Sequence, residues 1–367
     1  MTAVPSRVSH NLNVHESILQ TIGSTPLVRV NRIAAHLSCL LYAKVEFFNP
    51  GGSIKDRIGL NIITEAERSG RLKPGGTIVE ATSGNTGVGL AIVSAIKGYK
   101  TVFVLPDKMS QEKIQLLRAY GAQVVVTPTA VEPEDPRSYY SVAKRIVAET
   151  PNAILANQYH NPENPRSHYL TTGPEIWEQT QGQVTHAIIG MGTGGTISGI
   201  GKYLKEQNPA IRIIGVDPAG SILLETWQHG SIPEGAVARP YKIEGIGEDF
   251  LPSTLDLSVI DEIVQVTDKE AFQWTRRIVR EEGIFCGISS GAAFAGAMHS
   301  AEELTSDHLA VVVFPDSGSR YLSKVFDDKW MDENGFLESA SDATCLNDVL
   351  ADTAKKDLLA EMIADPV

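Results

Sequence analysis

The sequence predicts an α/β fold in which mainly parallel sheets are covered by helices on both faces. Short runs rich in β-branched residues alternate with stretches of helical period between about residues 41 and 325. This alternation is typical of βαβ units, whose strands run parallel. Glycine-rich segments recur where an expected strand gives way to a helix, and open α/β sheets bind their ligands at such junctions.

The individual elements follow from these runs. The expected strands are Leu41–Phe47, Thr77–Glu80, Thr101–Leu105, Gln123–Val126, Ala153–Asn157, Val184–Gly190, Ile211–Asp217 and His308–Phe314. The expected helices are Ile54–Glu67, Ile114–Tyr120, Val142–Thr150 and Thr196–Gln207. The long connection Ser231–Thr254 is rich in glycine and proline, and loops of this length in a compact domain usually serve function. From Leu337 the pattern fades into an acidic tail with one weak helix, Leu346–Ile363.

Composition narrows the class of protein. The chain has 367 residues, which is enough for one large domain or two lobes. A net charge of −12 and a pI near 5.3 argue against nucleic acid or an anionic membrane as partner, because both favour basic patches. The three cysteines form no CxxC pair, and the sequence has no apolar run of bilayer length. We therefore expect a cytosolic protein without a metal site.

Four glycine-rich segments carry the candidate chemistry. They are PGGSIKDR (Pro50–Arg57), TSGNTG (Thr82–Gly87), GMGTGGT (Gly190–Thr196) and GISSG (Gly287–Gly291). A single turn of this kind is ordinary, but four at equivalent positions predict one site built from several loops.

The segment GMGTGGT is a candidate phosphate loop. Its glycines let backbone N–H groups converge on an anion at a helix N-terminus, and Thr193 and Thr196 add hydroxyl donors. Gly190, Gly192 and Gly195 also satisfy the dinucleotide pattern G-x-G-x-x-G, with Asp217 as the ribose-binding acid. An NAD-dependent oxidoreductase and a non-enzymatic nucleotide sensor therefore stay open on this motif alone.

The segment GISSG matches the G-x-S-x-G nucleophile elbow of hydrolases, with Ser289 at its centre. A hydrolase of that type needs an acid and then a histidine later in the chain. His299 and His308 are the histidines that follow, and neither stands beyond a plausible acid. The required order fails, so the hydrolase interpretation is rejected.

Lys55 and the TSGNTG segment have both an ordinary and a chemical interpretation. A lysine in a turn is normally a solvated charge, whereas a desolvated one has a lowered pKa and forms Schiff bases. The TSGNTG hydroxyls cap a helix and suit a carboxylate. Asn85 can also donate to a phenolic oxygen.

Together the segments resemble the β-family of pyridoxal-phosphate enzymes (fold type II), the cysteine synthase/cystathionine β-synthase family. The resemblance covers about residues 16–335 and rests on IGSTPL (Ile22–Leu27), GGSIKDR, TSGNTG, GTGGT and GISSG occurring together. It implies two lobes with pyridoxal 5'-phosphate in the cleft between them. The small lobe would be about residues 47–157, the large lobe 16–46 plus 158–335, and residues 336–367 a tail or linker.

The resemblance also implies roles for individual residues. Lys55 would hold the cofactor as an aldimine and move the α-proton, Asn85 would bond the cofactor's 3-oxygen, and Ser289 would face the ring nitrogen. A hydroxyl there stabilises a carbanion less than a carboxylate does, which favours β-elimination over transamination. The phosphate would be held by Gly192, Thr193, Gly194, Gly195 and Thr196. The substrate would be held by Thr82, Ser83, Gly84, Thr86, Gln158, Tyr159, Glu244 and Gly245.

Three stretches favour the branch that joins serine and homocysteine, through an aminoacrylate, over the branch that joins O-acetylserine and sulfide. They are Asn157–Pro165, Tyr241–Phe250 and Phe314–Met331. Serine's hydroxide is a poor leaving group, and Tyr159 or Glu244 is a candidate to assist it. Alternatively, Glu244 only pairs with a basic residue nearby. The resemblance implies a homodimer with amino-acid substrates. We expect no haem segment, because residues 1–20 lack cysteine, and no C-terminal regulatory pair.

Overall fold

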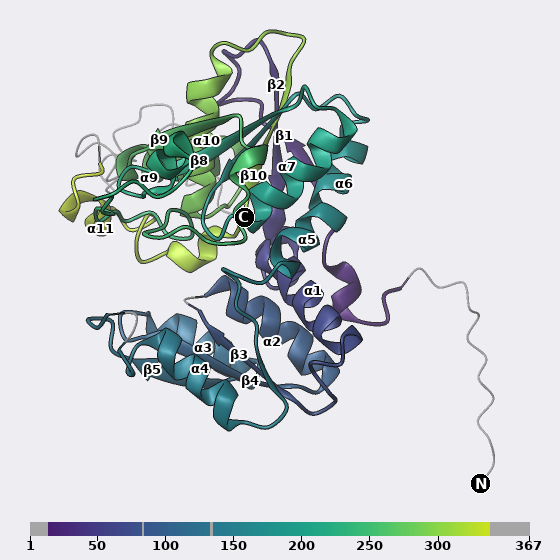
Figure 1. Ribbon diagram of the computed structural model, residues 1–367. Coiled ribbons are helices and arrows are strands. Elements are labelled where there is room, and N and C mark those ends of the chain that lie inside the picture. Colours follow the sequence, from purple (N-terminus) through teal and green to yellow (C-terminus); the bar gives the residue numbers. More distant parts are fainter. Residues whose placement is uncertain (1–13, 83, 133–134, 338–367) are drawn as a thin grey trace, which may run out of the picture.

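The computed structural model describes residues 14–82, 84–132 and 135–337. Two lobes lie one above the other in Figure 1, each built around its own sheet. The upper, larger lobe combines the first strands of the chain with its second half. The lower, smaller lobe is a continuous insertion between them, so the chain passes from the large lobe to the small lobe and back.

The large lobe contains a six-stranded sheet in the order β1-β2-β10-β7-β8-β9. Only β1 runs antiparallel to its neighbour, and the other pairs are parallel. Its strands are β1 (Leu27–Arg29), β2 (Leu40–Val45), β7 (His186–Gly190), β8 (Arg212–Pro218), β9 (Glu262–Val266) and β10 (Leu309–Phe314).

The small lobe contains a four-stranded parallel sheet in the order β5-β4-β3-β6. Its strands are β3 (Thr77–Ala81), β4 (Lys100–Pro106), β5 (Gln123–Thr127) and β6 (Ala153–Leu155). The expected mainly parallel α/β architecture is therefore confirmed.

Helices connect the strands in both lobes. The small lobe holds α1 (Lys55–Arg68), α2 (Asn85–Lys97), α3 (Gln111–Ala119) and α4 (Tyr139–Glu149). The large lobe holds α5 (Glu163–Leu170), α6 (Thr172–Gln179), α7 (Gly195–Gln207), α8 (Leu223–His229), α9 (Asp268–Arg277), α10 (Ile288–Ala301) and α11 (Asp328–Glu333). Short 3₁₀ turns occupy Ile18–Thr21, Glu46–Phe48, Leu257–Val259 and Gly318–Tyr321, and a π-helical turn occupies Ile278–Glu282.

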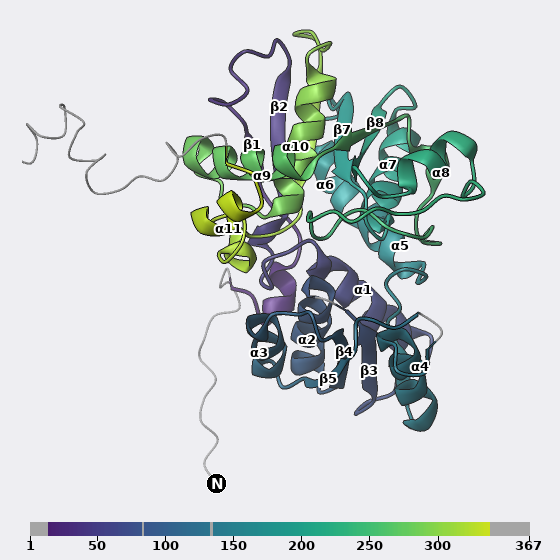
Figure 2. The same cartoon turned by 90° about the vertical axis from the view of Figure 1, so that its left-hand side faces the viewer.

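Both faces of each sheet are buried. In β3, Ile78 packs with α1 and α2, whereas its neighbour Val79 packs with Val142 of α4. In β10, Val312 lies in the core under α9 and α10, and Val311 lies in the core under α7. Figure 2 shows α10 and α7 on opposite sides of the large sheet. The near-continuous apolar runs of these strands are typical of parallel strands that are covered on both sides.

Some expected boundaries are wrong. The strand expected over Leu41–Phe47 ends at Val45, because residues 46–48 turn in a 3₁₀ helix that leads towards α1. The strand expected over Ala153–Asn157 ends at Leu155, and Asn157 has a left-handed backbone (φ 55°). Strands β1 and β9 were not expected; both lie at sheet edges, where part of each strand is exposed and the apolar pattern is weaker.

The rest of the organisation agrees with the sequence or lies outside the described residues. The connection Ser231–Thr254 contains no helix or strand in the described structure. The tail with Leu346–Ile363, and the N-terminal residues on which the haem argument rests, fall largely in the undescribed ranges 1–13 and 338–367.

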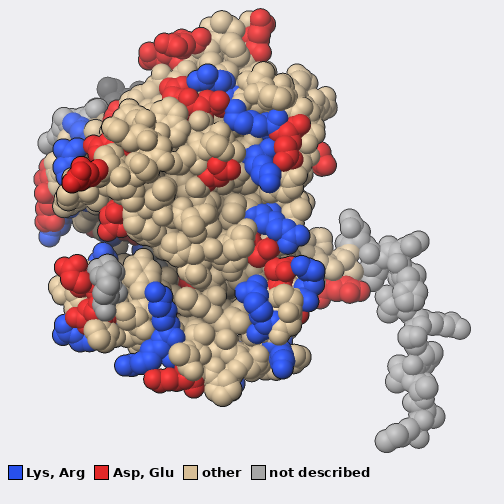
Figure 3. Space-filling model, in the orientation of Figure 1, with Lys and Arg blue, Asp and Glu red and all other residues tan. Residues whose placement is uncertain are grey.

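The visible surface carries charge of both signs. Figure 3 shows lysine and arginine intermixed with aspartate and glutamate over both lobes, and a hollow between the lobes at the left. Among the described residues, the helices are too short or too polar to cross a bilayer.

Candidate active site

A cavity lies between the two lobes, at the carboxyl ends of β7 and β10. Lys55 and Asn85 reach it from the first residues of α1 and α2 in the small lobe. The large lobe supplies the loop after β7, the start of α10 and the turn after β10. The lining residues are Ile54, Lys55, Asn85, Ile189, Gly190, Gly192, Thr193, Gly194, Thr196, Gly245, Ile246, Ser289, Val313, Pro315 and Asp316. The four glycine-rich segments therefore all contribute to one cavity.

Lys55 presents an amine that is chemically available. Within the described part of the chain, its side chain makes no hydrogen bond or ion pair, although it is surrounded by protein. Burial lowers the pKa of Lys55 to about 8, and the charges of Glu248 and Asp316 only partly oppose this shift. Its place at the helix N-terminus also disfavours a positive charge. About a tenth of the Lys55 side chains are thus neutral amines at pH 7, far more than for an ordinary lysine, and this is the form that attacks a carbonyl.

Asn85 is held in place by a buried carboxylate, Asp316. The Asn85 Nδ2 donates to Asp316 Oδ2 at 2.8 Å, and the Tyr321 hydroxyl donates to the same oxygen at 2.7 Å. Burial raises the pKa of Asp316, although these two donors oppose the shift. The Asn85 Oδ1 is buried with no partner among the described residues. An orphan amide oxygen beside the cavity is an expected feature of a site that receives a polar ligand.

The loop from Gly190 to Thr196 provides the anion site. Strand β7 ends at Gly190, and α7 begins at Gly195 after Gly194 in the left-handed region (φ 80°). A Cβ at Gly192 would lie 2.7 Å from the Gly245 carbonyl oxygen, and one at Gly195 would overlap the Asn164 side chain. These close approaches leave no room for side chains, so backbone N–H groups at the start of α7 stay accessible to an anion.

Two buried residues, Asn164 and His168, hold the threonines of the anion loop through hydrogen bonds. Asn164 Nδ2 donates to Thr193 Oγ1 at 3.0 Å. His168 lies 3.3 Å from Thr196 Oγ1 through Nε2 and 2.9 Å from Thr172 Oγ1 through Nδ1. Burial holds the pKa of His168 well below its usual range, with a smaller contribution from the charge of Lys55. The ring therefore stays neutral and exchanges hydrogen bonds with both threonines.

The TSGNTG segment lies at the mouth of the small lobe between β3 and α2. Thr82 and Thr86 are buried, and the Thr86 hydroxyl donates to Gln158 Oε1 at 2.6 Å. The backbone N–H of Gly84 donates a hydrogen bond to Thr82 Oγ1 at 3.3 Å. Ser83 lies outside the described residues. Thr82, Gly84, Thr86 and Gln158 adjoin the cavity lining through Asn85 and are not themselves part of it.

Glu244 pairs with basic residues, as the alternative interpretation of the sequence held, but these residues are not on its own loop. Its carboxylate pairs with Lys113 of α3 in the small lobe at 2.7 Å, and with Lys324 of the large lobe. Burial alone would raise the pKa of Glu244, but the two lysines lower it below its usual value. The partners lie outside its own loop, so the carboxylate joins the two lobes. Its neighbour Gly245 does line the cavity.

Of the predicted residues Ser289 and Tyr159, only Ser289 lines the cavity. Ser289 is buried in the first turn of α10 and lines the cavity. Tyr159 packs edge-on against Phe250 with ring centroids 5.2 Å apart. Burial raises the pKa of Tyr159 well above its usual value, followed by the charge of Glu248, so the hydroxyl keeps its proton.

Two motif interpretations need correction. The segment GISSG follows a π-helical turn and an isolated bridge, and PGGSIKDR follows a 3₁₀ turn, so only TSGNTG and GMGTGGT come directly after strands. Asp217, the ribose acid of the dinucleotide interpretation, is fully buried and accepts the Leu224 N–H at 3.1 Å. Its carboxylate caps the turn into α8, which removes the support for an NAD site.

Sequence reasoning missed two acidic residues of the site. Asp316 lines the cavity because it lies two residues beyond β10, one of the two central strands of the large sheet. Its position after a strand end is the signal that was available. Glu248 lies in the long connection, two residues beyond the lining residue Ile246. No local pattern in the sequence distinguishes it.

The residues present fit pyridoxal phosphate. The glycine loop at the start of α7 suits the phosphate and the Lys55 amine suits a Schiff base. Asn85 Nδ2 gives one N–H to Asp316 and has a second N–H that could donate to the cofactor's 3-oxygen. In addition, a side chain at Gly192 would collide with the Gly245 carbonyl and one at Gly195 with the Asn164 side chain, so glycine is required in the loop that would hold the phosphate.

Comparison with known proteins supports this assignment. Residues 18–316 match the family model described as pyridoxal-phosphate dependent enzyme. A cystathionine beta-synthase from Oryctolagus cuniculus is 49% identical over 88% of this chain and 58% of its own length. A cysteine synthase from Staphylococcus aureus (strain N315) is 45% identical over 84% of this chain and 96% of its own. This chain thus spans about three fifths of the length of the rabbit protein.

A solved structure gives the same result for the fold. The crystal structure of an O-ureido-L-serine synthase superposes with a TM-score of 0.79 at 38% identity, over 90% of this chain and 98% of that one. Its match extends across both lobes. The chain therefore belongs to the family of pyridoxal-phosphate-dependent enzymes and has the fold type II architecture.

Proposed function

We propose that the protein is a pyridoxal-phosphate-dependent lyase that condenses L-serine with L-homocysteine to cystathionine by β-replacement. The observation that carries the chemistry is the Lys55 amine, lowered in pKa to about 8 and facing the glycine loop across one cavity. Relatives named cystathionine beta-synthase, which are 43–49% identical over 88–95% of the chain, support the choice of reaction.

The cofactor would be held from both lobes. Lys55 would bind it covalently, Asn85 would bond the 3-oxygen, and Ser289 would face the ring nitrogen. Bound there, pyridoxal phosphate would supply an acceptor for the electron pair that remains at the substrate α-carbon. The phosphate would be held by Gly192, Thr193, Gly194, Gly195 and Thr196.

The protein itself would position the substrate and move its protons. The hydroxyls and amides of the TSGNTG loop and Gln158 would bind the substrate carboxylate. This would place the α-hydrogen against Lys55, whose neutral amine would remove it as base and later return it as acid. Residues 47–157 would form the small lobe, and residues 16–46 plus 158–335 the large lobe. The lobes would close over the substrate and exclude water.

The choice of serine over O-acetylserine depends on assistance to the leaving group. Acetate leaves readily, whereas hydroxide needs a proton. Glu244 is engaged by Lys113 and Lys324 and is better suited to holding the lobes together. Tyr159 keeps its proton strongly and is better suited to donating a hydrogen bond. Cysteine synthase, which uses O-acetylserine and sulfide, remains the second candidate because the Staphylococcus aureus relative is 45% identical.

We also propose a cytosolic homodimer whose partners are small amino acids. The family resemblance carries the choice of a dimer. The exposed large apolar side chains of the described residues include Phe48 at 62% and Leu322 at 59%, and a dimer would cover such groups only where they form a contiguous patch. Sedimentation equilibrium at twice the monomer mass would agree with the dimer, and a monomer at all concentrations would contradict it.

Product analysis tests the proposed reaction. Purified protein is given serine with homocysteine, and separately O-acetylserine with sulfide, and the products are identified by mass spectrometry. The proposal expects efficient formation of cystathionine from the first pair. Cysteine from the second pair, with no cystathionine from the first, would assign the chain to the cysteine synthase reaction.

A further inference from the structure

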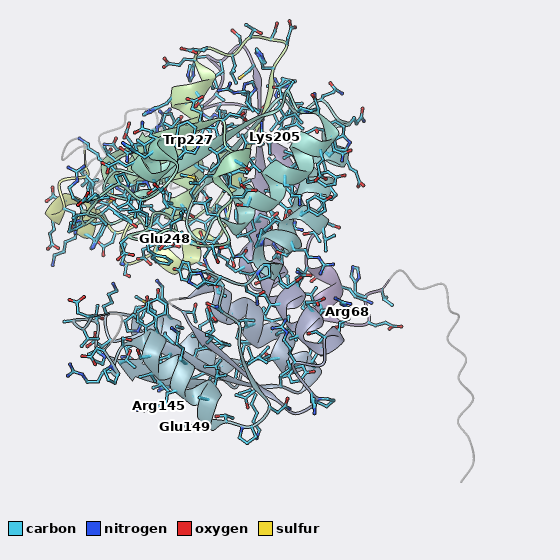
Figure 4. All side chains as sticks on the ribbon, in the orientation of Figure 1. Arg68, Arg145, Glu149, Lys205, Trp227 and Glu248 are labelled. Carbon is cyan, nitrogen blue, oxygen red and sulfur yellow. The ribbon has the colours of Figure 1, made fainter. Side chains whose placement is uncertain are left out.

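Glu248 carries a carboxyl group at the cleft between the lobes, and the reaction proposed above assigns no role to it. Figure 4 shows it at the edge of the large lobe that faces the small lobe. Its backbone is fixed on both sides: the Glu248 N–H donates to Ser221 Oγ at 3.1 Å, and its carbonyl accepts the Ile222 N–H at 3.1 Å. The preceding Gly247 N–H donates to Met191 O at 2.6 Å, next to the anion loop.

These bonds fix the backbone of the loop to the large lobe, beside the anion loop. The Tyr159 hydroxyl donates a hydrogen bond to it, and Tyr159 directly follows Gln158, which belongs to the proposed substrate set. The Lys55 amine is close enough for the charges of the two groups to influence each other. Glu248 is therefore near Lys55 and contacts Tyr159, the neighbour of Gln158 in the proposed substrate set.

The surroundings keep Glu248 protonated. Burial raises the pKa of Glu248 to about 8, the nearby charge of Asp249 raises it further, and Lys55 and the Tyr159 hydrogen bond oppose the shift. The other ionisable groups that face it are carboxyls and phenols rather than cations; they are Asp217, Tyr139, Tyr140 and Tyr241. Near neutral pH the group is thus a carboxylic acid that can give up its proton.

The other acidic groups near the cavity are less suited to this task. Glu244 is ionised between two lysines, and Asp316 is occupied by Asn85 and Tyr321. Tyr159 has a pKa well above its usual value. Within the described residues of the site, Glu248 combines a transferable proton with a place at the substrate loop.

We propose that Glu248, oriented by Tyr159, is the acid that protonates the departing β-hydroxyl of serine. The inference rests on the proposed serine reaction and deepens it. It names the residue that would act as general acid for the hydroxyl leaving group. It also explains why a carboxyl group lies in a cleft that disfavours its charged form.

The step balances as follows in atoms and electrons. The Cβ–O bond breaks with its electron pair on oxygen, and this oxygen takes the Glu248 proton and departs as water. The electron pair left at Cα, after Lys55 has removed the α-proton, becomes the Cα=Cβ double bond. The homocysteine thiol then adds through sulfur to Cβ, and its proton returns to the Glu248 carboxylate. The Cα=Cβ pair goes back to Cα and takes the proton held by Lys55.

A comparison of leaving groups tests the assignment. Enzyme loaded with pyridoxal phosphate is mixed with L-serine or with β-chloro-L-alanine in the absence of homocysteine, and pyruvate released on acid quench reports elimination. Chloride leaves without a proton, so only serine requires the acid. We expect Glu248→Gln to slow elimination from serine by roughly 100-fold or more, in the range of general acid catalysis, and to leave β-chloro-L-alanine little changed.

The neighbouring carboxylate provides a matched control. Asp249 is exposed, and Asp249→Asn removes only the neighbouring charge that helps to raise the pKa of Glu248. This variant keeps the Glu248 carboxyl, so it should retain most of the elimination from serine and all of it from β-chloro-L-alanine. Equal losses of Glu248→Gln with both compounds, or no loss with serine, would overturn the assignment. Wild-type enzyme that eliminates chloride from β-chloro-L-alanine but does not react with serine would instead refute the proposed function. The wild-type measurement alone shows this, so the two failures are distinguishable.

Infrared spectroscopy gives a second measure that does not depend on turnover. A pH titration of the protein should show a carbonyl band of a protonated carboxylic acid that disappears with a midpoint near pH 8. The band should be missing in Glu248→Gln and kept in Asp249→Asn. Its persistence in Glu248→Gln would assign the proton to another group and contradict the proposal.

Discussion

At the scale of single residues, the environment separates two desolvated lysines by function. Lys44 is fully buried, and its ammonium donates to the Thr25 carbonyl, Glu175 and Gln179 at 2.7–2.9 Å. Lys55 lacks such partners among the described residues, and burial lowers its pKa to about 8. Both groups are desolvated, but only Lys55 is free to react. Burial alone therefore does not identify the reactive lysine; the absence of partners does.

The anion loop depends on glycine at one position in particular. We expect Gly195→Ala to weaken pyridoxal phosphate binding at least about tenfold, because the new methyl group would displace Asn164 and with it the hydrogen bond to Thr193. Cofactor titration followed by absorbance measures the dissociation constant.

Gly230→Ala is the matched control for Gly195→Ala. Gly230 has a left-handed backbone (φ 73°) with open space around it, so the change costs about 1 kcal/mol of stability without affecting the cofactor. Equal affinities for the cofactor in wild type and Gly195→Ala would contradict this account of the loop.

Sequence reasoning found much of the site but not all its contacts. Lys55, Asn85, Ser289 and the residues of the anion loop lie in glycine-rich segments with a recognisable pattern, and the structure brings them to one cavity. Asp316 and Glu248 stand in no such pattern, because their importance arises from burial and from neighbours distant in sequence. The two lysine partners of Glu244 are likewise a tertiary feature, 131 and 80 residues away.

At the scale of elements, a buried carboxyl group links strand β3 to the segment that follows β6. Glu80 in β3 accepts the N–H groups of Asn157 at 2.6 Å and Gln158 at 3.2 Å. These bonds fix the segment that carries Gln158 and Tyr159 to the site. Burial raises the pKa of Glu80 to about 7, although the two backbone donors oppose the shift.

This raised pKa predicts a dependence of stability on pH. Between about pH 4.3 and 7 the unfolded chain loses the Glu80 proton while the folded protein keeps it. Fewer protons are then bound in the unfolded state, so the free energy of unfolding falls as pH rises through this window. Glu80→Gln lacks this contribution and should gain about 2 kcal/mol relative to wild type between pH 5 and pH 8.

Urea denaturation at the two pH values measures the difference. Glu149→Gln is the control, because Glu149 is exposed at the end of α4, where Figure 4 labels it beside Arg145. A relative stability of Glu80→Gln that does not change between pH 5 and pH 8 would show that the carboxyl titrates normally.

The strands were predictable where their apolar runs are buried on both faces. The patterns of β3, β4 and β10 match their observed bounds within about two residues because such runs are typical of central parallel strands. The short β1, with its last two residues exposed, and the alternating β9 gave a weaker signal. The sequence also did not indicate that the strands form two sheets, since this depends on which strands pair across long separations.

At the scale of the whole molecule, two of the ion-pair clusters that join the lobes differ in their exposure to solvent. At the base, Arg57 of α1 pairs with Glu46 at 2.7 Å and with Glu175 of α6 at 2.7 Å, and the Arg57 and Glu46 side chains are almost completely buried. On the other side, the Lys113–Glu244–Lys324 cluster is partly open to solvent. Buried pairs are costly to break, whereas partly exposed pairs contribute little. We expect the base to act as the pivot and the exposed cluster to open.

A double-mutant cycle tests the exposed contact. Lys113→Ala and Glu244→Gln, alone and together, should show a coupling of about 0.5–1 kcal/mol in the free energy of unfolding. The coupling should shrink at high salt, because part of the pair faces solvent. Lys108→Ala serves as the control, because Lys108 is an exposed lysine in the turn that precedes α3. Additive effects of the Lys113 and Glu244 changes would mean that the contact contributes nothing to joining the lobes.

The central claim is that Lys55 carries the cofactor, and peptide mapping tests it most directly. The purified, cofactor-loaded protein is reduced with borohydride, which makes a Schiff base permanent, and is then digested and analysed by mass spectrometry. The account predicts one pyridoxyl-modified peptide, with the modification on Lys55. A modification on another lysine such as Lys44, or a cofactor that reduction leaves unattached, would contradict it.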